Sequence, residues 1–193
     1  YPYDGKGYWD GDALVWGQGG GLSAFVAMRD ATKESEVENL YGAMDDMMFK
    51  GIQYFCQLDH GILAYSCYPA AGNERFYDDN VWLGIDFTDT YQMTQEQKYL
   101  DKAQLIWKFI ESGTDSILGG GIYWCEQKKE SKNTCSNAPG SVLALKLFKA
   151  TNDSIYFRQG KELYEWTQKN LQDSTDYLYF DNIGLDRKIG KAK

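Results

Sequence analysis

The stretch TQEQKYLDKAQLIWKFI, residues 94–110, decides the fold class, because its apolar side chains recur every three or four residues. This spacing is typical of a helix that buries one face. The stretch TNDSIYFRQGKELYEWTQKNL, residues 151–171, repeats the pattern, with Thr151 in the place of Thr94. We call the shift from position 94 to position 151 the repeat offset. A looser copy, TKESEVENLYGAMDDMMFKGI, begins at Thr32 with a slightly larger shift. The chain therefore contains a helical repeat.

A second, more apolar helix is expected before each amphipathic one, over residues 13–30, 78–93 and 136–150. Each repeat is then a hairpin of two helices and roughly 60 residues, with the apolar helix on the inside. The loops GILAYSCYP (61–69) and GGGIYWCE (119–126) have a strand-like composition between glycine or proline boundaries. The sequence thus predicts an all-α fold of helical hairpins with short β-hairpin loops at one end, in a single domain.

The composition limits the classes of partner. The formal net charge is −8 and the pI is about 4.7, so the phosphates of a nucleic acid would be repelled. The sequence has no run of 18 apolar residues, which argues against a membrane span, and its first residues lack the pattern of a signal peptide. Aromatic residues make up 16% of the chain. Among these, Tyr and Trp side chains can either fill a hydrophobic core or form a flat surface on which a sugar ring stacks.

The four cysteines are Cys56, Cys67, Cys125 and Cys135, and they show no C-x-x-C spacing. Because the chain also has a single histidine, we expect no metal site. Two disulfides can be drawn, Cys56 with Cys67 and Cys125 with Cys135, and free thiols are an equally good interpretation.

The candidate site is the stretch FYDDNVWLG, residues 76–84, in which Asp78 and Asp79 stand side by side at the predicted start of an inner helix. Capping of the helix is the ordinary interpretation of such residues. The repeat shifts, however, place Trp16 and the Cys-Ser-Asn sequence ending at Asn137 at the same end of the neighbouring inner helices. We therefore expect these side chains to converge on one pocket.

Two carboxyl groups held close together cannot both ionise easily, so their pKa values separate. Glycoside cleavage needs such a pair, with one carboxyl group charged and the other protonated. The aromatic rings of Tyr77 and Trp124, near the pair in the expected fold, are candidates for stacking on a sugar.

Three stretches carry a resemblance to a known family: RFYDDNVWLGID (75–86), GGGIYWCEQKKESKNTCSNAPG (119–140) and KLFKATNDSIYF (146–157). Together they resemble glycoside hydrolase family 76, the endo-α-1,6-mannanases, which are (α/α)6 barrels of six helical hairpins. The resemblance implies a retaining hydrolase of α-1,6-linked mannan, with Asp78 as nucleophile and Asp79 as general acid/base. It also places Trp124 and Asn137 near the sugar, and it implies no cofactor.

The chain holds about three of the six hairpins, so we expect it to form the N-terminal half of such a barrel. The expected partner is an α-mannan oligosaccharide or polysaccharide, and the expected location is extracellular, at the cell surface or periplasmic. Two alternatives stay open. One is a transglycosylase that acts on cell-wall or anchor glycans, and the other is a non-catalytic, glycan-binding component of a carbohydrate-uptake system.

Overall fold

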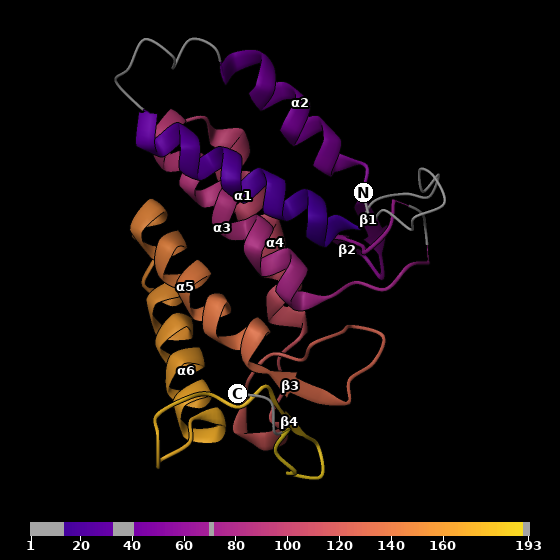
Figure 1. Ribbon diagram of the computed structural model, residues 1–193, viewed down its shortest axis with the longest axis vertical. Coiled ribbons are helices and arrows are strands. Elements are labelled where there is room, and N and C mark those ends of the chain that lie inside the picture. Colours follow the sequence, from indigo (N-terminus) through magenta and orange to yellow (C-terminus); the bar gives the residue numbers. More distant parts are fainter. Residues whose placement is uncertain (1–13, 33–40, 70–71, 191–193) are drawn as a thin grey trace, which may run out of the picture.

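The described part of the chain forms three helical hairpins (Figure 1). The structure, a computed structural model, describes residues 14–32, 41–69 and 72–190. The helices of this part of the chain are α1 (Val15–Thr32), α2 (Tyr41–Gln53), α3 (Tyr77–Thr94), α4 (Gln97–Ser112), α5 (Thr134–Thr151) and α6 (Ser154–Leu171). Helix α3 packs against α1 on one side and α5 on the other, and α2, α4 and α6 each pack against the helix before them. The predicted all-α hairpin fold is confirmed.

The repeat inferred from the sequence is also present in the helix boundaries. Helices α3 and α5 are related by the repeat offset at both ends, and a single shift likewise relates both ends of α1 to those of α3. The two threonines that mark the repeat have a different place from the one expected, since Thr94 and Thr151 end the inner helices instead of opening the outer ones. Their hydroxyl groups accept the backbone N–H of Glu96 and Asp153, both at 3.2 Å. The threonines therefore stabilise the turns between paired helices.

Short strands lie at the ends of the hairpins where the inner helices begin, on the right-hand side and below in Figure 1. Strands β1 (Cys56–Asp59) and β2 (Ile62–Tyr65) form an antiparallel hairpin, as predicted for this loop. Strands β3 (Ser131–Asn133) and β4 (Asn182–Gly184) pair in the same sense.

For the second loop, residues 119–126, the prediction of strand-like structure was wrong in the first half. The loop begins at the end of a 3-10 turn, η2 (Ile117–Gly119), and continues with isolated bridges. The glycines at positions 119, 120 and 121 have φ angles of +76°, +121° and +82°, which break an extended strand.

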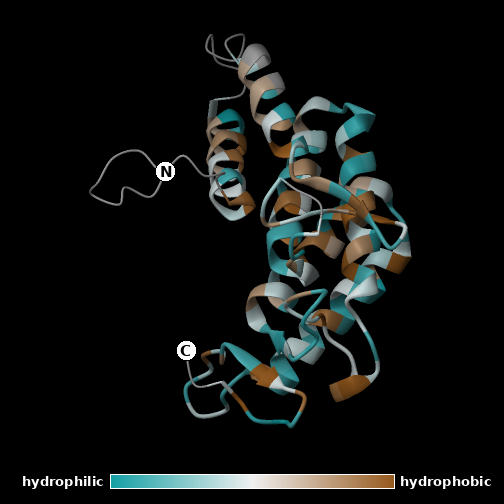
Figure 2. Ribbon diagram, turned by 90° about the vertical axis from the view of Figure 1, so that its right-hand side faces the viewer, coloured by the Kyte–Doolittle hydropathy of each residue, from teal (hydrophilic) through white to brown (hydrophobic). Residues whose placement is uncertain are grey.

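The hydrophobic core lies where the inner and outer helices face one another. Figure 2 shows apolar (brown) and polar (teal) residues alternating along these helices. Inner helix α3 is buried over most of its circumference, whereas α4 and α6 bury one stripe and expose the rest. Each fully buried large apolar side chain contributes about 1.5–3 kcal/mol to folding. This burial fixes the direction of α3, and hence the place of its first turn.

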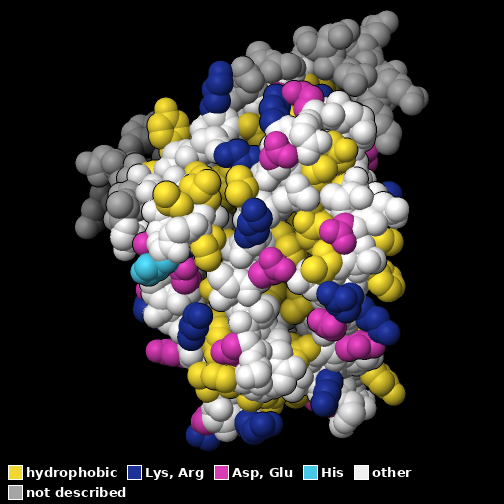
Figure 3. Space-filling view, turned by 180° about the vertical axis from the view of Figure 1, so that it is seen from behind, with side chains coloured by type: hydrophobic (Ala, Val, Ile, Leu, Met, Phe, Trp, Pro, Cys, Tyr) yellow, Lys and Arg dark blue, Asp and Glu magenta, His cyan; other side chains and the backbone are white. Residues whose placement is uncertain are grey.

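The surface carries interspersed acidic and basic side chains, with apolar groups between them on the face seen in Figure 3. Inner helix α5 exposes Val142 and Leu145, which are 45% and 41% accessible. Across the described residues, none of the helices combines the length and the apolar character that crossing a bilayer requires.

All four cysteines are free thiols in the structure. Cys125 is buried, Cys56 and Cys67 are half-buried, and Cys135 is exposed. The sequence left disulfides and free thiols equally open, and the structure has free thiols.

Candidate active site

The two aspartates lie in the first turn of α3, where the unpaired N–H groups of the helix favour negative charge. The N-cap residue is Phe76, whose side chain makes no capping hydrogen bond. Instead, the N–H of Tyr77 donates to the backbone carbonyl of Trp124 at 2.9 Å. The start of the helix is therefore held by a neighbouring loop, and Asp78 and Asp79 do not occupy the N-cap position.

Two buried asparagines, related by the repeat offset, attach these loops to the inner helices. The side chain of Asn80 accepts the N–H of Tyr65 and donates to its carbonyl, both at 2.8 Å. The side chain of Asn137 makes the same pair of bonds to the backbone of Ile122, at 2.6 and 2.8 Å. Asn137 is 0% exposed. The expectation that it contacts sugar is therefore corrected: its amide is fully used in holding the loop.

Two buried cations, related by the same offset, hold the loops as well. The guanidinium of Arg75 donates two hydrogen bonds of 2.6 Å to the carboxylate of Glu126 and one of 2.8 Å to the carbonyl of Ile62. The ammonium of Lys132 donates to Asp115 at 2.7 Å and to two loop carbonyls. Both cations are almost completely buried, at 1% and 0% exposure. Sequence reasoning missed this pair, although the repeat offset relates the two positions.

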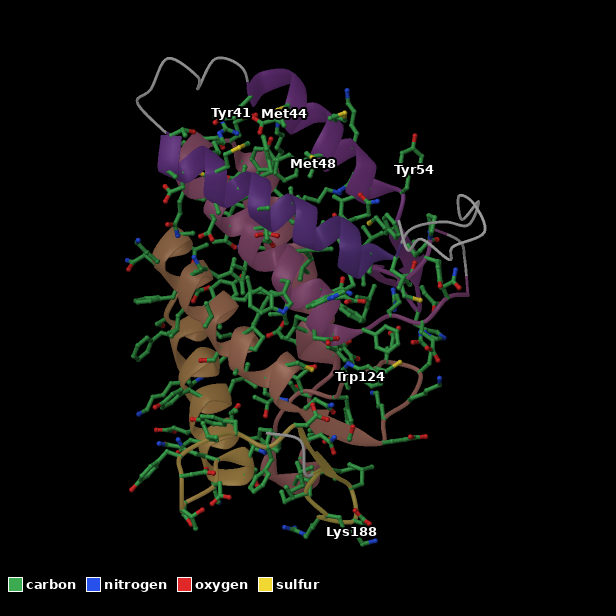
Figure 4. All side chains as sticks on the ribbon, viewed as in Figure 1. Tyr41, Met44, Met48, Tyr54, Trp124 and Lys188 are labelled. Carbon is green, nitrogen blue, oxygen red and sulfur yellow. The ribbon has the colours of Figure 1, made fainter. Side chains whose placement is uncertain are left out.

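The loops and helix starts border an open cavity of about 300 Å³ at the aspartate pair. Its lining consists of Leu14, Trp16, Cys67, Phe76, Asp78, Asp79 and Trp124. Four of the six side chains predicted for the site thus meet in one place: both aspartates and the two tryptophans. Figure 4 shows Trp124 between the start of α3 and strand β3. Trp16 and Trp124 are 58% and 41% exposed, so their rings are accessible to a ligand.

Tyr77, predicted to stack on sugar, lies in the core instead. Its side chain is 0% exposed, and its ring stacks on that of Phe109 with the centroids 4.5 Å apart. The reason is helical geometry. Consecutive residues of a helix point about 100° apart, and here Asp78 and Asp79 face the cavity while Tyr77 faces the interior.

The two carboxyl groups differ in their electrostatic surroundings. Burial raises the pKa of Asp79 to about 7, and the neighbouring charge of Asp78 contributes to this rise. Burial also raises the pKa of Asp78, but the Cys135 thiol and the Trp124 indole oppose that rise. The indole Nε1–H of Trp124 donates to Oδ2 of Asp78 at 3.1 Å. The arrangement therefore favours negative charge on Asp78 over negative charge on Asp79.

A larger hollow, of about 740 Å³, lies two turns further along α3. Asp86 and Asp89 line it together with Lys146 of α5, which forms an ion pair with Asp89. Asp86 is 4% exposed, accepts a hydrogen bond from Ser23 at 2.7 Å, and has a pKa raised to about 7 by burial. This second group of acids is separate from the cavity at Asp78.

Comparison with known proteins settles the family. The family model described as Glycosyl hydrolase family 76 matches residues 2–192. The chain belongs to this family. No curated relative matches it. The six helices are accordingly part of the (α/α)6 barrel of family 76, which confirms the fold and the resemblance inferred from the sequence.

Several solved structures of family 76 are similar to this chain. The family 76 mannosidase Bt3792 from Bacteroides thetaiotaomicron VPI-5482 has a TM-score of 0.92 and 59% identity, and the match covers all of this chain and 54% of that protein. The α-1,6-mannanase GH76A from Salegentibacter sp. HEL1_6 has a TM-score of 0.77 and 25% identity, over 98% of this chain and 51% of that one.

An inactive variant of the same Salegentibacter enzyme, with two consecutive aspartates changed to asparagine, was solved in complex with α-1,6-mannotriose. It has a TM-score of 0.73 and 26% identity, over 91% of this chain and 47% of that one. This chain spans about half the length of each of these solved structures.

Proposed function

We propose that Asp78 and Asp79 are the catalytic pair of a retaining glycoside hydrolase that cleaves α-1,6-linked mannan. The observation that carries the proposal is the meeting of two adjacent carboxyl groups and two exposed tryptophans in one cavity of about 300 Å³. Family 76 membership and the mannosidase and mannanase relatives support the substrate class. The α-1,6 linkage is supported by the ligands of the Salegentibacter complexes.

In the proposed reaction, the Asp78 carboxylate attacks the anomeric carbon while Asp79 gives its proton to the leaving glycosidic oxygen. The glycosidic C–O bond breaks, and a covalent mannosyl ester of Asp78 forms. Asp79, now charged, takes a proton from a water molecule that attacks the same carbon, and this step releases the mannosyl product with retained configuration and restores both carboxyl groups. The unequal pKa values of the pair match these two roles.

Retention is preferred over inversion because the two acids are consecutive residues on the first turn of one helix. Retaining enzymes hold their carboxyl groups about 5–5.5 Å apart, whereas inverting enzymes need about 6.5–9.5 Å to admit a water molecule. The Cα atoms of consecutive residues are about 3.8 Å apart, and both side chains here line the same cavity. The exposed rings of Trp16 and Trp124 would form the walls against which mannose units stack.

We further propose an extracellular, cell-surface or periplasmic location, as the polymeric substrate requires. The proposed bond-making and bond-breaking steps involve the two carboxyl groups, the sugar and water, and the proposed partner is an α-mannan oligosaccharide or polysaccharide.

The test compares Asp78→Asn and Asp79→Asn in the intact protein, with Asp101→Asn as the matched control. Asp101 lies on outer helix α4 and accepts a hydrogen bond from Gln97, away from the cavity. Both site variants should lose the hydrolysis of α-1,6-mannan oligosaccharides by at least about a thousandfold, with the circular dichroism spectrum unchanged. Wild-type rates in both variants would disprove the assignment.

An activated substrate separates the two roles. On an α-1,6-mannobioside with a dinitrophenolate leaving group, Asp79→Asn should keep much of the first step, because this leaving group needs no proton. Asp78→Asn should remain inactive on it. In the wild-type protein, kcat/KM on oligosaccharides should fall above pH of about 7, where Asp79 loses its proton, and Asp79→Asn should abolish that decline. Products longer than the substrate would indicate transfer to a sugar hydroxyl, and sugar binding without turnover would indicate a binding protein.

A further inference from the structure

The loop that carries Trp124 contains a feature beyond an aromatic wall. The indole Nε1–H of Trp124 points at Oδ2 of Asp78, with 3.1 Å between nitrogen and oxygen. The same ring lies against that of Phe76, with the centroids 4.8 Å apart. Two contacts thus restrict the indole: the ring of Phe76 packs against it, and its N–H is bound to the carboxylate of Asp78.

The backbone of Trp124 is fixed as well. Its carbonyl accepts the N–H of Tyr77 at 2.9 Å, and its N–H donates to the carbonyl of Ser131 at 3.2 Å. The adjoining segment is tied down by the two hydrogen bonds between Arg75 and Glu126. A side chain held in this way reaches Asp78 at little further cost in conformational entropy.

The first repeat gives an internal comparison. Cys67 precedes Trp124 by the repeat offset, and its carbonyl accepts the N–H of Val15 at the start of α1, at 3.0 Å. The Tyr77 bond to Trp124 is the equivalent interaction at the start of α3. The same backbone arrangement therefore carries a small thiol in the first repeat and a ring with an N–H donor in the second. The donor is in the repeat whose inner helix bears Asp78.

We infer that Trp124 is a positioning residue of the proposed reaction, whose indole N–H orients the Asp78 carboxylate and stabilises its charge for attack on the anomeric carbon. The inference rests on the proposed function. A hydrogen bond to the charged form of a carboxyl group favours ionisation and fixes the plane of the group. The other titratable groups that face Asp78 are Asp79, whose own pKa is raised in part by the charge of Asp78, and the thiol of Cys135.

The first experiment needs no catalytic activity. In a ¹H–¹⁵N spectrum of the intact protein, the indole N–H signal of Trp124 is identified by its loss in Trp124→Phe. It should shift between pH 3 and 8 as Asp78 ionises, and the shift should vanish in Asp78→Asn. Trp166 is the internal control, because its indole donates at 3.0 Å to the carbonyl of Leu118, which does not titrate. A Trp124 signal whose pH dependence is the same in wild type and Asp78→Asn would overturn the inference.

The second experiment is kinetic. Trp124→Phe keeps a ring against Phe76 and removes the N–H, so kcat should fall about tenfold and the acidic limb of the kcat/KM profile should move up by about one pH unit, with KM little changed. The matched control is Trp16→Phe, in the same cavity, which should affect KM and leave the acidic limb in place.

A Trp124→Phe variant with the kcat and pH profile of the wild type would show that the ring serves only for stacking, and would overturn the inference. If the wild-type protein hydrolyses no mannan, the proposed function fails, while the spectroscopic titration still decides whether the indole senses Asp78.

Discussion

Replacing Arg75 by Met should destabilise the fold by about 3–4 kcal/mol. Methionine replaces the aliphatic stem of Arg75 with an unbranched apolar side chain but lacks the guanidinium. The substitution therefore removes two charge-assisted hydrogen bonds to Glu126 and one to the carbonyl of Ile62. The side chains of Arg75 and Glu126 are only 1% and 14% exposed. The carboxylate of Glu126, left without its partner, would therefore gain little contact with water. Breaking a buried ion pair from one side costs about 3–5 kcal/mol. The partial exposure of Glu126 places the estimate near the lower end.

The assay is urea unfolding of the intact protein, followed by circular dichroism and tryptophan fluorescence. The matched control is Lys128→Met, because the Lys128–Glu74 ion pair belongs to the same two segments but is exposed, at 58% and 36%. This control should leave the unfolding midpoint where it is in the wild type. Arg75→Lys retains the charge without the fork of two parallel donors and should give an intermediate loss. A loss below about 1 kcal/mol in Arg75→Met, or one no larger than in Lys128→Met, would refute the reasoning.

Further predictions concern the core and the loops. Asn137→Ala should lower the free energy of unfolding by about 2–3 kcal/mol in urea titrations and leave KM unchanged, whereas an increase in KM without loss of stability would restore the sugar-binding interpretation. Gly121→Ala should cost about 2–4 kcal/mol, because the residue has a φ of +82° and an added Cβ would lie 2.6 Å from the ring of Trp166. Gly119→Ala, with a φ of +76° and open space around it, should cost only about 1–2 kcal/mol in thermal melts. The Asp86 carboxyl, with a pKa raised to about 7, favours the fold fully below pH of about 4, and this contribution is lost as the pH rises to about 7. Asp86→Asn should therefore be more stable than wild type at pH 8, by about 1–3 kcal/mol, and equal to it at pH 4.

Much of the fold could be predicted from the sequence because the signal is repeated. Each copy of the helix pattern supports the others, and the repeat offset found at Thr94 and Thr151 is also the offset between helix boundaries in the structure. The position of those threonines could not be fixed from the sequence, since the end of one helix and the start of the next are only a few residues apart. In the structure each hydroxyl group donates to a carbonyl four residues earlier and accepts an N–H two residues later, which places both threonines at the ends of inner helices.

The site could be predicted in part because the repeat shifts show which residues lie at the same height along neighbouring inner helices, which we call their level. They brought Trp16 to the aspartate pair, and its ring lines the same cavity. They also led to Asn137, which lies at the right level but on a side of the helix that faces a loop carbonyl and N–H. Level along a helix follows from sequence spacing, whereas direction around it depends on which neighbour is packed there. That is why Tyr77 and Asn137 were assigned to the sugar and are found in the interior.

The paired asparagine and cation interactions have an evolutionary consequence. The groups that hold the loops, Asn80 with Arg75 and Asn137 with Lys132, occur in the second and third repeats. The residue three positions after each cation differs, since it is Asp78 in the second repeat and Cys135 in the third. Support and reactivity therefore reside on different side chains. A lineage could exchange the reactive groups at the rim one at a time, or an engineer could introduce a new acid at position 135, without redesigning the architecture underneath.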